Sequence, residues 1–583
     1  MILKRRHSYF LLFLFILTAC GAPRTAVSPI QTQPDPITQA PETAVSPIEQ
    51  STEAIPTLIT PTEPPPATVT PSPVPSDLSI DASQVFLYPT PIIYDGDRVT
   101  FQLLAHVPDT IRAENVQVQI WVNNELLVQD ILGRRNLANN AVGLYEWVWD
   151  TTDKIGEHQV SILLDPNDSI QQGDENPANN QVLLTTYVED SNLLSEGEQN
   201  ATWVTAETNC CTVHVVSETA AFRDLSNLLI EVENAFQNAS ATLDEPANKK
   251  YDVFLVDRVI GQGGYAGQSM VVSYLDRHYA SNGLEQVLIH EAVHLLDRQF
   301  APGRITFLAE GVAVWASGGH YKPENIEQRA AALVSTDRYI PLQALIDNFY
   351  PVQHEIGYLE AAGFVNYLIK IYGWNQFKTF YANVTRDDGA TLSEAMDVNL
   401  QASFGITLAQ AEANWLDYLS QLPFNPDMNS DLLTSIRFYD TMRTYQRFYD
   451  PTAYFLTAWL PYPQELQSSG NPADLTRHPS AEINVTLEVM LQAAELALRT
   501  GDFARANAHL DSIERVLTHN GTFIDPLSIS YLNVVRAATA QGFAVQTINL
   551  SGNSASVLAN RPGTIELTEL NFSLNGSEWV LSN

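Results

Sequence analysis

The run His290-Glu291-Ala292-Val293-His294 constrains this chain more than any other feature of its sequence. It lies in the segment 284–297, whose apolar residues recur at spacings of three and four, as in a helix with one buried face. Side chains four residues apart share a face of a helix, so His290 and His294 can bind one metal ion. Glu291 then lies beside that ion, where its carboxylate can deprotonate a water held by the metal. The alternative is a surface helix with two unrelated histidines.

Glu310 is the predicted third metal ligand. It is the single acid in the apolar segment 305–315, and a buried carboxylate without a partner is costly. Zinc in a hydrolase normally has three protein ligands and one open position, so a cation bound by His290, His294 and Glu310 would satisfy this carboxylate. The alternative is that Glu310 pairs with Arg304 or caps a turn. The sequence therefore predicts Zn²⁺ as the cofactor.

Two motifs together resemble those of the gluzincin metallopeptidases, in the peptidase MA-like group. A His-Glu-x-x-His motif begins at His290, and an aromatic-Leu-x-Glu-Gly-x-Ala motif begins at Phe307. The resemblance implies that the two histidines and Glu310 bind zinc, that Glu291 is the general base, and that the substrate is a peptide or protein. It also implies a zincin-like α+β domain, which we place at 203–425.

The resemblance has one departure and several further implications. Val314 stands where thermolysin-like relatives carry an acid that orients a ligating histidine, so Asp297 is a candidate for that role, or else a solvated residue. Tyr358, near the start of a following predicted helix, can donate a hydrogen bond to an oxyanion, or it packs as an ordinary aromatic residue.

Three predicted strands and a helix precede the motif. Strands are expected at 212–216, 251–256 and 270–274, with a helix at 220–237 between the first two. The resemblance implies that 270–274 is an antiparallel edge strand above the cleft, to which an extended substrate can add by main-chain hydrogen bonds.

The N-terminus indicates export. Basic residues at 4–6 precede a short apolar run at 9–17, and the sequence Leu17-Thr18-Ala19-Cys20 resembles a bacterial lipobox. The resemblance implies a signal peptide at 1–19, lipid attached to Cys20, and a protein anchored outside the cytoplasm to the bacterial cell membrane. An ordinary secretory signal is the alternative. Residues 20–76 are rich in Pro and Thr, which favours a disordered tether.

Residues 77–190 alternate between apolar and polar positions in short runs, which predicts a β-sandwich. The Gly-x-His strand that begins at Gly156 and the Glu-Asn-x-x-Asn-Asn turn that begins at Glu175 resemble the immunoglobulin-like CARDB domains. The acids near this turn bind calcium or, alternatively, are solvated.

The region 428–583 gives weaker signals. Helices are expected at 432–449 and 487–518, followed by strands between 543 and 581, which favours a small α+β region of the NTF2-like kind. The predicted fold class is therefore multidomain: an Ig-like β-sandwich, a zincin-like α+β domain and a C-terminal α+β region.

Charge and cysteine usage narrow the remaining possibilities. The formal net charge of −36 repels nucleic acid and anionic lipid head groups. Cys210 and Cys211 are adjacent, which favours packing residues or, alternatively, a vicinal disulfide. The sequence thus predicts a membrane-anchored, extracytoplasmic zinc metallopeptidase; the alternative is a binding or adhesion lipoprotein with a non-catalytic zincin-like scaffold.

Overall fold

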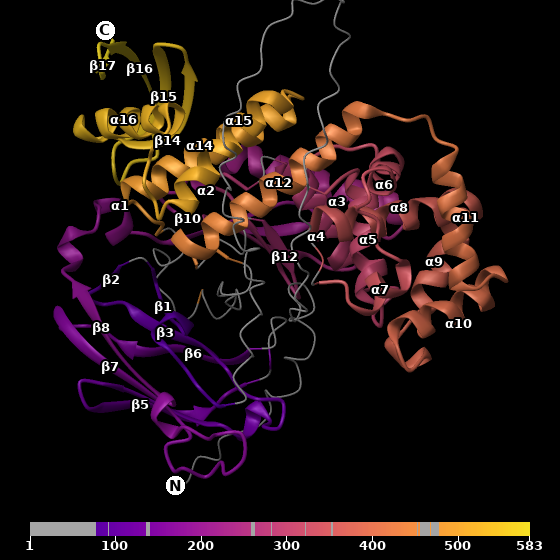
Figure 1. Cartoon of the computed structure of the whole chain (residues 1–583), viewed down its shortest axis with the longest axis horizontal. Coiled ribbons are helices and arrows are strands. Elements are labelled where there is room, and N and C mark those ends of the chain that lie inside the picture. The colour runs from indigo at the N-terminus through magenta and orange to yellow at the C-terminus, as the bar shows by residue number, and fades with distance from the viewer. Residues whose placement is uncertain are drawn as a thin grey trace, which may run out of the picture.

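The described part of the chain has three hydrophobic cores, one in each of three regions. Figure 1 shows these regions in indigo to purple, magenta to orange, and yellow. This computed structural model describes residues 77–582 except for 91, 134, 136–139, 258–262, 281–282, 321, 351, 353, 452, 455–466 and 468–476. The predicted signal peptide, the tether and Cys20 lie outside the described residues. The predicted fold class, a β-sandwich followed by two α+β regions, is confirmed.

The N-terminal region is a sandwich of two sheets with strand orders β1-β3-β6 and β2-β8-β7-β4-β5. Alternate residues of β6 and β7 are buried between the sheets, because successive side chains of a strand point to opposite faces. The strands are β1 (Val85–Tyr88), β2 (Ile93–Tyr94), β3 (Arg98–Ala105), β4 (Gln117–Val122), β5 (Glu125–Ile131), β6 (Ala141–Asp150), β7 (Gly156–Leu164) and β8 (Gln181–Glu189).

The second region contains a five-stranded sheet in the order β12-β13-β11-β10-β9. The strands are β9 (Trp203–Glu207), β10 (Cys211–Val216), β11 (Tyr251–Val256), β12 (Gly264–Ala266) and β13 (Met270–Ser273). The prediction that 270–274 forms an antiparallel edge strand is wrong. β13 is an inner strand parallel to β11, and its outer neighbour β12 is the antiparallel edge. All four residues of β13 are buried, as expected for an inner strand that is covered on both faces.

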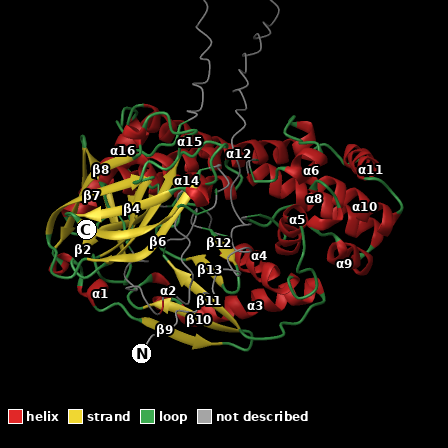
Figure 2. Ribbon diagram, turned by 90° about the horizontal axis from the view of Figure 1, so that it is seen from below, coloured by secondary structure: helices red, strands yellow, loops and turns green. Residues whose placement is uncertain are grey.

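Helices cover this sheet and extend beyond it; Figure 2 shows α5, α6 and α8–α11 gathered away from the strands. The helix expected at 220–237 is two helices, because Asp224 separates them and its carboxylate accepts hydrogen bonds from Arg223 and Tyr274. The helices are α2 (Ala220–Arg223), α3 (Leu225–Leu243), α4 (Leu284–Asp297), α5 (Thr306–Ser317), α6 (Ile326–Ser335), α7 (Leu342–Asp347), α8 (His354–Tyr372), α9 (Trp374–Asn383), α10 (Leu392–Phe404) and α11 (Leu408–Ser420).

The C-terminal region packs three helices against an antiparallel sheet in the order β14-β15-β16-β17. The sheet follows the helices, as the sequence predicts, while the NTF2-like assignment stays a prediction. The elements are α14 (Glu482–Arg499), α15 (Phe503–Thr518), α16 (Pro526–Ala540), β14 (Ala544–Ser551), β15 (Ser554–Asn560), β16 (Thr568–Asn575) and β17 (Glu578–Leu581).

The long helix α12 (Pro426–Tyr449) belongs to both neighbouring cores. Its residues Leu432 and Ile436 lie in the core of the second region, and Tyr439 and Tyr445 lie in the core of the C-terminal region. In Figure 1 it runs through the middle of the molecule between the two. The two regions therefore share one continuous element.

Buried ion pairs also join the regions. Arg277, which follows β13, pairs with Glu488 of α14, and Arg477 makes two hydrogen bonds to Asp97 of the sandwich, at 2.6 and 3.1 Å. A guanidinium group that engages both oxygens of a carboxylate fixes orientation as well as distance. These contacts hold the sandwich and the C-terminal region to the body of the protein.

Two further sequence interpretations can be compared with the structure. A disulfide joins Cys210 and Cys211 at the start of β10, which is one of the two alternatives. Within the described residues, no helix combines the length and the apolar character needed to span a membrane.

We predict that Gly311→Ala destabilises the protein by about 1–2 kcal/mol. A Cβ at Gly311 would lie 2.8 Å from the Ala361 carbonyl oxygen and 2.8 Å from Val365 Cγ2, so α5 and α8 would have to separate. Overpacking of this kind costs about 1–3 kcal/mol, which exceeds the gain of up to about 1 kcal/mol from the better helix former. The shift of the midpoint in urea denaturation measures the difference.

The matched control is Gly357→Ala in α8, where the new Cβ would meet its nearest neighbours at 3.4–3.5 Å, an ordinary contact distance. This variant should be neutral or more stable. Equal destabilisation by both substitutions would contradict the close contact between α5 and α8.

Candidate metal centre

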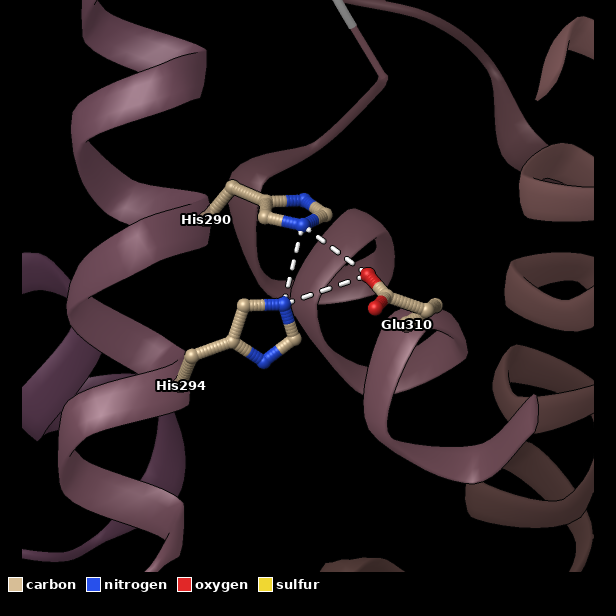
Figure 3. Close-up of side chains that lie close together, drawn as sticks. All are labelled: His290, His294 and Glu310. Atoms are coloured by element: carbon tan, nitrogen blue, oxygen red, sulfur yellow. Dashed lines mark hydrogen bonds and ion pairs between the residues drawn. The ribbon is translucent and has the colours of Figure 1, made fainter. Parts of the chain in front are cut away.

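Three side chains from two neighbouring helices converge on one point (Figure 3). His290 and His294 lie one turn apart on α4, and Glu310 lies on α5, which packs against it. The Nε2 atoms of the two histidines are 3.1 Å apart, and Glu310 Oε2 is 3.2 Å from His290 Nε2 and 3.1 Å from His294 Nε2. The residues predicted as metal ligands thus form a nearly equilateral triangle of donor atoms.

This triangle has the size that a zinc ion requires. Ligand atoms at about 2.0–2.1 Å from a tetrahedral zinc lie about 3.3 Å from one another. Two imidazole nitrogens and one carboxylate oxygen are also the donor types that zinc prefers. All three side chains are buried, where two facing nitrogens and an acid at this distance need a cation or a shared proton between them. The residues present therefore fit zinc.

The charges of the three groups depend on one another. Burial lowers the pKa of His290, but the hydrogen bond to Glu310 and the negative charges of Glu291 and Glu310 outweigh this effect, so the pKa is raised overall. Burial raises the pKa of Glu310, but the charges of the two histidines and their hydrogen bonds lower it by more. The pKa of this carboxyl group is therefore well below its usual range. Because its pKa is raised, His290 keeps its proton to a higher pH than an ordinary imidazole, and a metal that binds there must displace that proton.

Glu291 lies between the metal triangle and the edge of the sheet. It is buried, which raises its pKa against the opposing charges of His290 and His294. A Cβ at Gly264 in β12 would lie 3.2 Å from Glu291 Cγ, so the edge strand passes directly over this side chain. A carboxylate with a raised pKa beside the predicted metal site is well suited to accept a proton.

Asp297 does not orient either histidine. It is fully buried at the end of α4, where it forms an ion pair with Arg304 at 2.9 Å and accepts a hydrogen bond from the Tyr381 hydroxyl at 2.6 Å. Within the described residues, the Nδ1 atoms of His290 and His294 have no hydrogen-bond partner. The interpretation of Asp297 as the residue that orients a ligating histidine is therefore wrong. The alternative of a solvated residue is also wrong, because Asp297 is buried and its bond to Tyr381 joins α4 to α9.

Arg304 also resolves the alternative interpretation of Glu310. Its guanidinium pairs with Asp297 and donates to the His294 carbonyl oxygen at 3.3 Å, while Glu310 contacts the two histidines. The carboxylate thus lies where a ligand is needed and has no ion pair with Arg304 in this structure.

Tyr358 lies in the first turns of α8, close to the triangle. Its ring centroid is 6.3 Å from that of His290, and it stacks on His320 at 4.5 Å. His320, which sequence reasoning missed, follows α5 and bonds to Glu355 of α8. No local sequence pattern distinguishes His320 from other histidines. Its position ten residues after Glu310 is the one feature of the sequence that relates it to the site. The role of Tyr358 in binding an oxyanion stays a prediction.

A second group of acids lies in the sandwich. Asp165, Asp168 and Asp174 bring one carboxylate oxygen each to within 4.8 Å of the others; Asp165 and Asp174 are buried and Asp168 is exposed. The calcium and solvated-turn interpretations of this loop both stay predictions.

Comparisons with known proteins give likenesses of fold. No family model matches the chain, and no curated protein matches it. The CARDB domain of a Pyrococcus furiosus protein is 14% identical, with a TM-score of 0.16, over 20% of this chain and 94% of that one. An M1 zinc metallopeptidase from Deinococcus radiodurans is 14% identical, with a TM-score of 0.26, over 60% of this chain and 96% of that one. An aminopeptidase N family protein from Idiomarina loihiensis is 10% identical, with a TM-score of 0.22, over 67% and 78%.

We predict that the purified protein binds about one zinc ion per chain. His290→Ala and His294→Ala should each weaken zinc binding by more than about 100-fold, since loss of a group that only orients a metal ligand already costs about 10–100-fold. Affinity should also fall as the pH is lowered, because zinc must displace the proton that the raised pKa of His290 retains. Metal analysis and competition with a chelator measure both effects.

His519→Ala is the matched control, because this histidine is exposed at the end of α15. It should bind zinc as the wild type does. Full zinc retention in a His290→Ala/His294→Ala double variant would contradict the assignment.

Proposed function

We propose that this protein is a zinc metallopeptidase that hydrolyses peptide bonds. The observation that carries the proposal is the triangle of His290, His294 and Glu310, with a buried carboxylate, Glu291, next to it. A metal that only stabilised the fold would typically have four protein ligands and no adjacent base. Three ligands and a base are the arrangement of a hydrolytic site.

Each residue then has a defined task. His290, His294 and Glu310 would hold zinc, which when bound polarises a carbonyl group and acidifies water. Glu291 accepts a proton from the attacking water and later donates it to the departing amine. Tyr358 donates a hydrogen bond to the oxyanion that develops on the former carbonyl oxygen.

The edge strand β12 is the proposed docking site for an extended peptide. The carbonyl oxygen of Gly263 accepts a hydrogen bond from Ser273 of β13, and the N–H of Gly267 donates to Ser269 in the turn before β13. The alternating pattern of an antiparallel pair then turns the backbone groups of Gly264 and Ala266 to the open side of the sheet. Arg298 donates a hydrogen bond to the carbonyl oxygen of Ala266 at 2.9 Å. The N–H and C=O of Gly264, which lies beside Glu291, are then the groups to which a peptide would bond. A substrate bound through main-chain groups is recognised by its extended shape more than by its sequence.

We further propose that the protein acts outside the cytoplasm, attached to the bacterial membrane through lipid on Cys20. The support is the lipobox-like sequence before Cys20, followed by the Pro- and Thr-rich stretch to residue 76. A tether of this composition would separate the catalytic domain from the lipid surface.

Glu291→Gln should separate metal binding from catalysis. The amide keeps the size of the side chain and loses the base, so zinc content should stay unchanged while kcat falls by about 10²–10⁴-fold. Assays on flexible peptides with metal analysis of the same sample test this. Glu285→Gln, on the same helix, is the control and should retain activity. Wild-type turnover in Glu291→Gln would transfer the base role elsewhere, and an inactive, zinc-loaded wild type would favour the scaffold alternative.

For localisation, Cys20→Ser should abolish incorporation of labelled fatty acid and release or misprocess the chain. Fractionation of cells that express each form measures the change. A wild-type protein that is wholly soluble and unlabelled would refute the anchor.

A further inference from the structure

A second buried pair of titratable groups lies next to the metal triangle, and the proposed reaction does not use it. His320 Nδ1 is 2.7 Å from Glu355 Oε1, and both side chains are 4% exposed. Burying such a pair costs desolvation free energy, which an apolar pair of the same size would avoid. The position of these two residues therefore calls for an explanation beyond packing.

Close backbone contacts constrain the described residues next to His320. Gly318 ends α5 in the left-handed conformation, with φ of 72°, and a Cβ at Gly319 would lie 1.8 Å from the Lys322 carbonyl oxygen. The backbone N–H of His320 donates to Glu324 Oε2 at 3.1 Å. These contacts constrain the backbone at His320, whose imidazole bonds to Glu355 of α8.

A buried cation anchors this segment in turn. The fully buried Arg329 of α6 pairs with Glu324 at 2.5 Å and with Asp431 of α12 at 3.2 Å. Glu324 thus links the backbone of His320 to two helices. Such a supporting network is what keeps a functional side chain within a narrow range of positions.

The ring of His320 stacks on that of Tyr358 and lies 6.4 Å from that of His290. The ring centroids of His320 and Tyr358 are 4.5 Å apart, with an interplanar angle of 24°. The ring centroids of Tyr358 and His290 are 6.3 Å apart, with an interplanar angle of 29°. Phe349 contacts the Tyr358 ring at 5.1 Å. Glu355 and Tyr358 lie three residues apart, on one face of α8, so the same turn of helix bonds to the imidazole and stacks on it.

We propose that His320, held by Glu355, is a positioning residue that fixes the Tyr358 ring beside His290, so that its hydroxyl meets the oxyanion of the reaction. This inference rests on the proposed function, in which Tyr358 is that donor. A displacement of about 1 Å in such a group can cost on the order of 100-fold in rate. His320 thus acts on the reaction through Tyr358.

The test is a double-mutant cycle on the zinc-loaded full chain. Tyr358→Phe should lower kcat by about 10²-fold, the loss of one oxyanion donor. His320→Ala should lower kcat at least about 10-fold with KM and zinc content nearly unchanged, and it should have less than about a twofold effect in the Tyr358→Phe background. Equal effects of His320→Ala in both backgrounds would overturn the proposal, and so would an unchanged kcat in His320→Ala.

Two further variants separate positioning from stability. Glu355→Gln keeps an oxygen that can accept from His320 and should restore most of the activity that Glu355→Ala loses. His509→Ala removes another buried histidine, which bonds to Tyr531 in the C-terminal region, and should lower the melting temperature without changing kcat. If His509→Ala loses as much activity as His320→Ala, the loss in His320→Ala is explained by lower stability, and the positioning role is contradicted.

A readout without activity distinguishes failure of this proposal from failure of the proposed function. Crystal structures of the zinc-loaded wild type and His320→Ala should show the Tyr358 ring displaced in the variant and unchanged in His509→Ala. A Tyr358 ring that stays in place in His320→Ala overturns the positioning role, whether or not the wild type cleaves peptides. If the ring is displaced in His320→Ala but the wild type does not cleave peptides, the positioning role is supported and only the peptidase assignment is contradicted.

Discussion

The packing of α4 against α5 is the contact on which the rest of the centre depends. It forces two imidazoles and a carboxylate into a buried triangle with sides of 3.1–3.2 Å, an arrangement that is unfavourable unless positive charge lies within it. Gly311 permits this geometry, because the missing side chain lets α8 approach the turn that carries Glu310. On the other side, the ion pair of Asp297 with Arg304 holds the end of α4.

The helix α8 packs against α5 and places two side chains next to the centre. It contributes the close contact with Gly311, the carboxylate of Glu355 and the ring of Tyr358, all within its first twelve residues. One helix thus packs against a ligand-bearing element and delivers two side chains to the edge of the site. Both of these side chains are buried.

Local patterns in the sequence predicted the parts of the site that depend on local geometry. The spacing of His290 and His294 implies one helical face, and the lone acid at Glu310 in an apolar segment implies a buried partner. The remaining features depend on contacts between distant residues. Asp297 looked like a histidine partner because it follows His294 by one turn, but its partners Arg304 and Tyr381 decide its role.

The edge of the sheet and the His320 pair were missed for the same reason. The three residues of β12 are too few to show a period, whereas the valines of β13 look like a complete strand, so the edge was assigned to the wrong segment. His320 meets Glu355 across 35 residues, a contact that no local motif encodes. Sequence patterns report which face of an element is buried, and tertiary contacts report what it is buried against.

The shared helix α12 has a consequence for how the molecule unfolds. Because its first half completes one core and its second half completes the next, neither core can open at this helix without exposing apolar side chains of the other. The two regions should therefore form one cooperative unit, with amide hydrogens in both exchanging through a common opening. The C-terminal region, which carries no part of the metal site, thereby contributes to the lifetime of the folded centre.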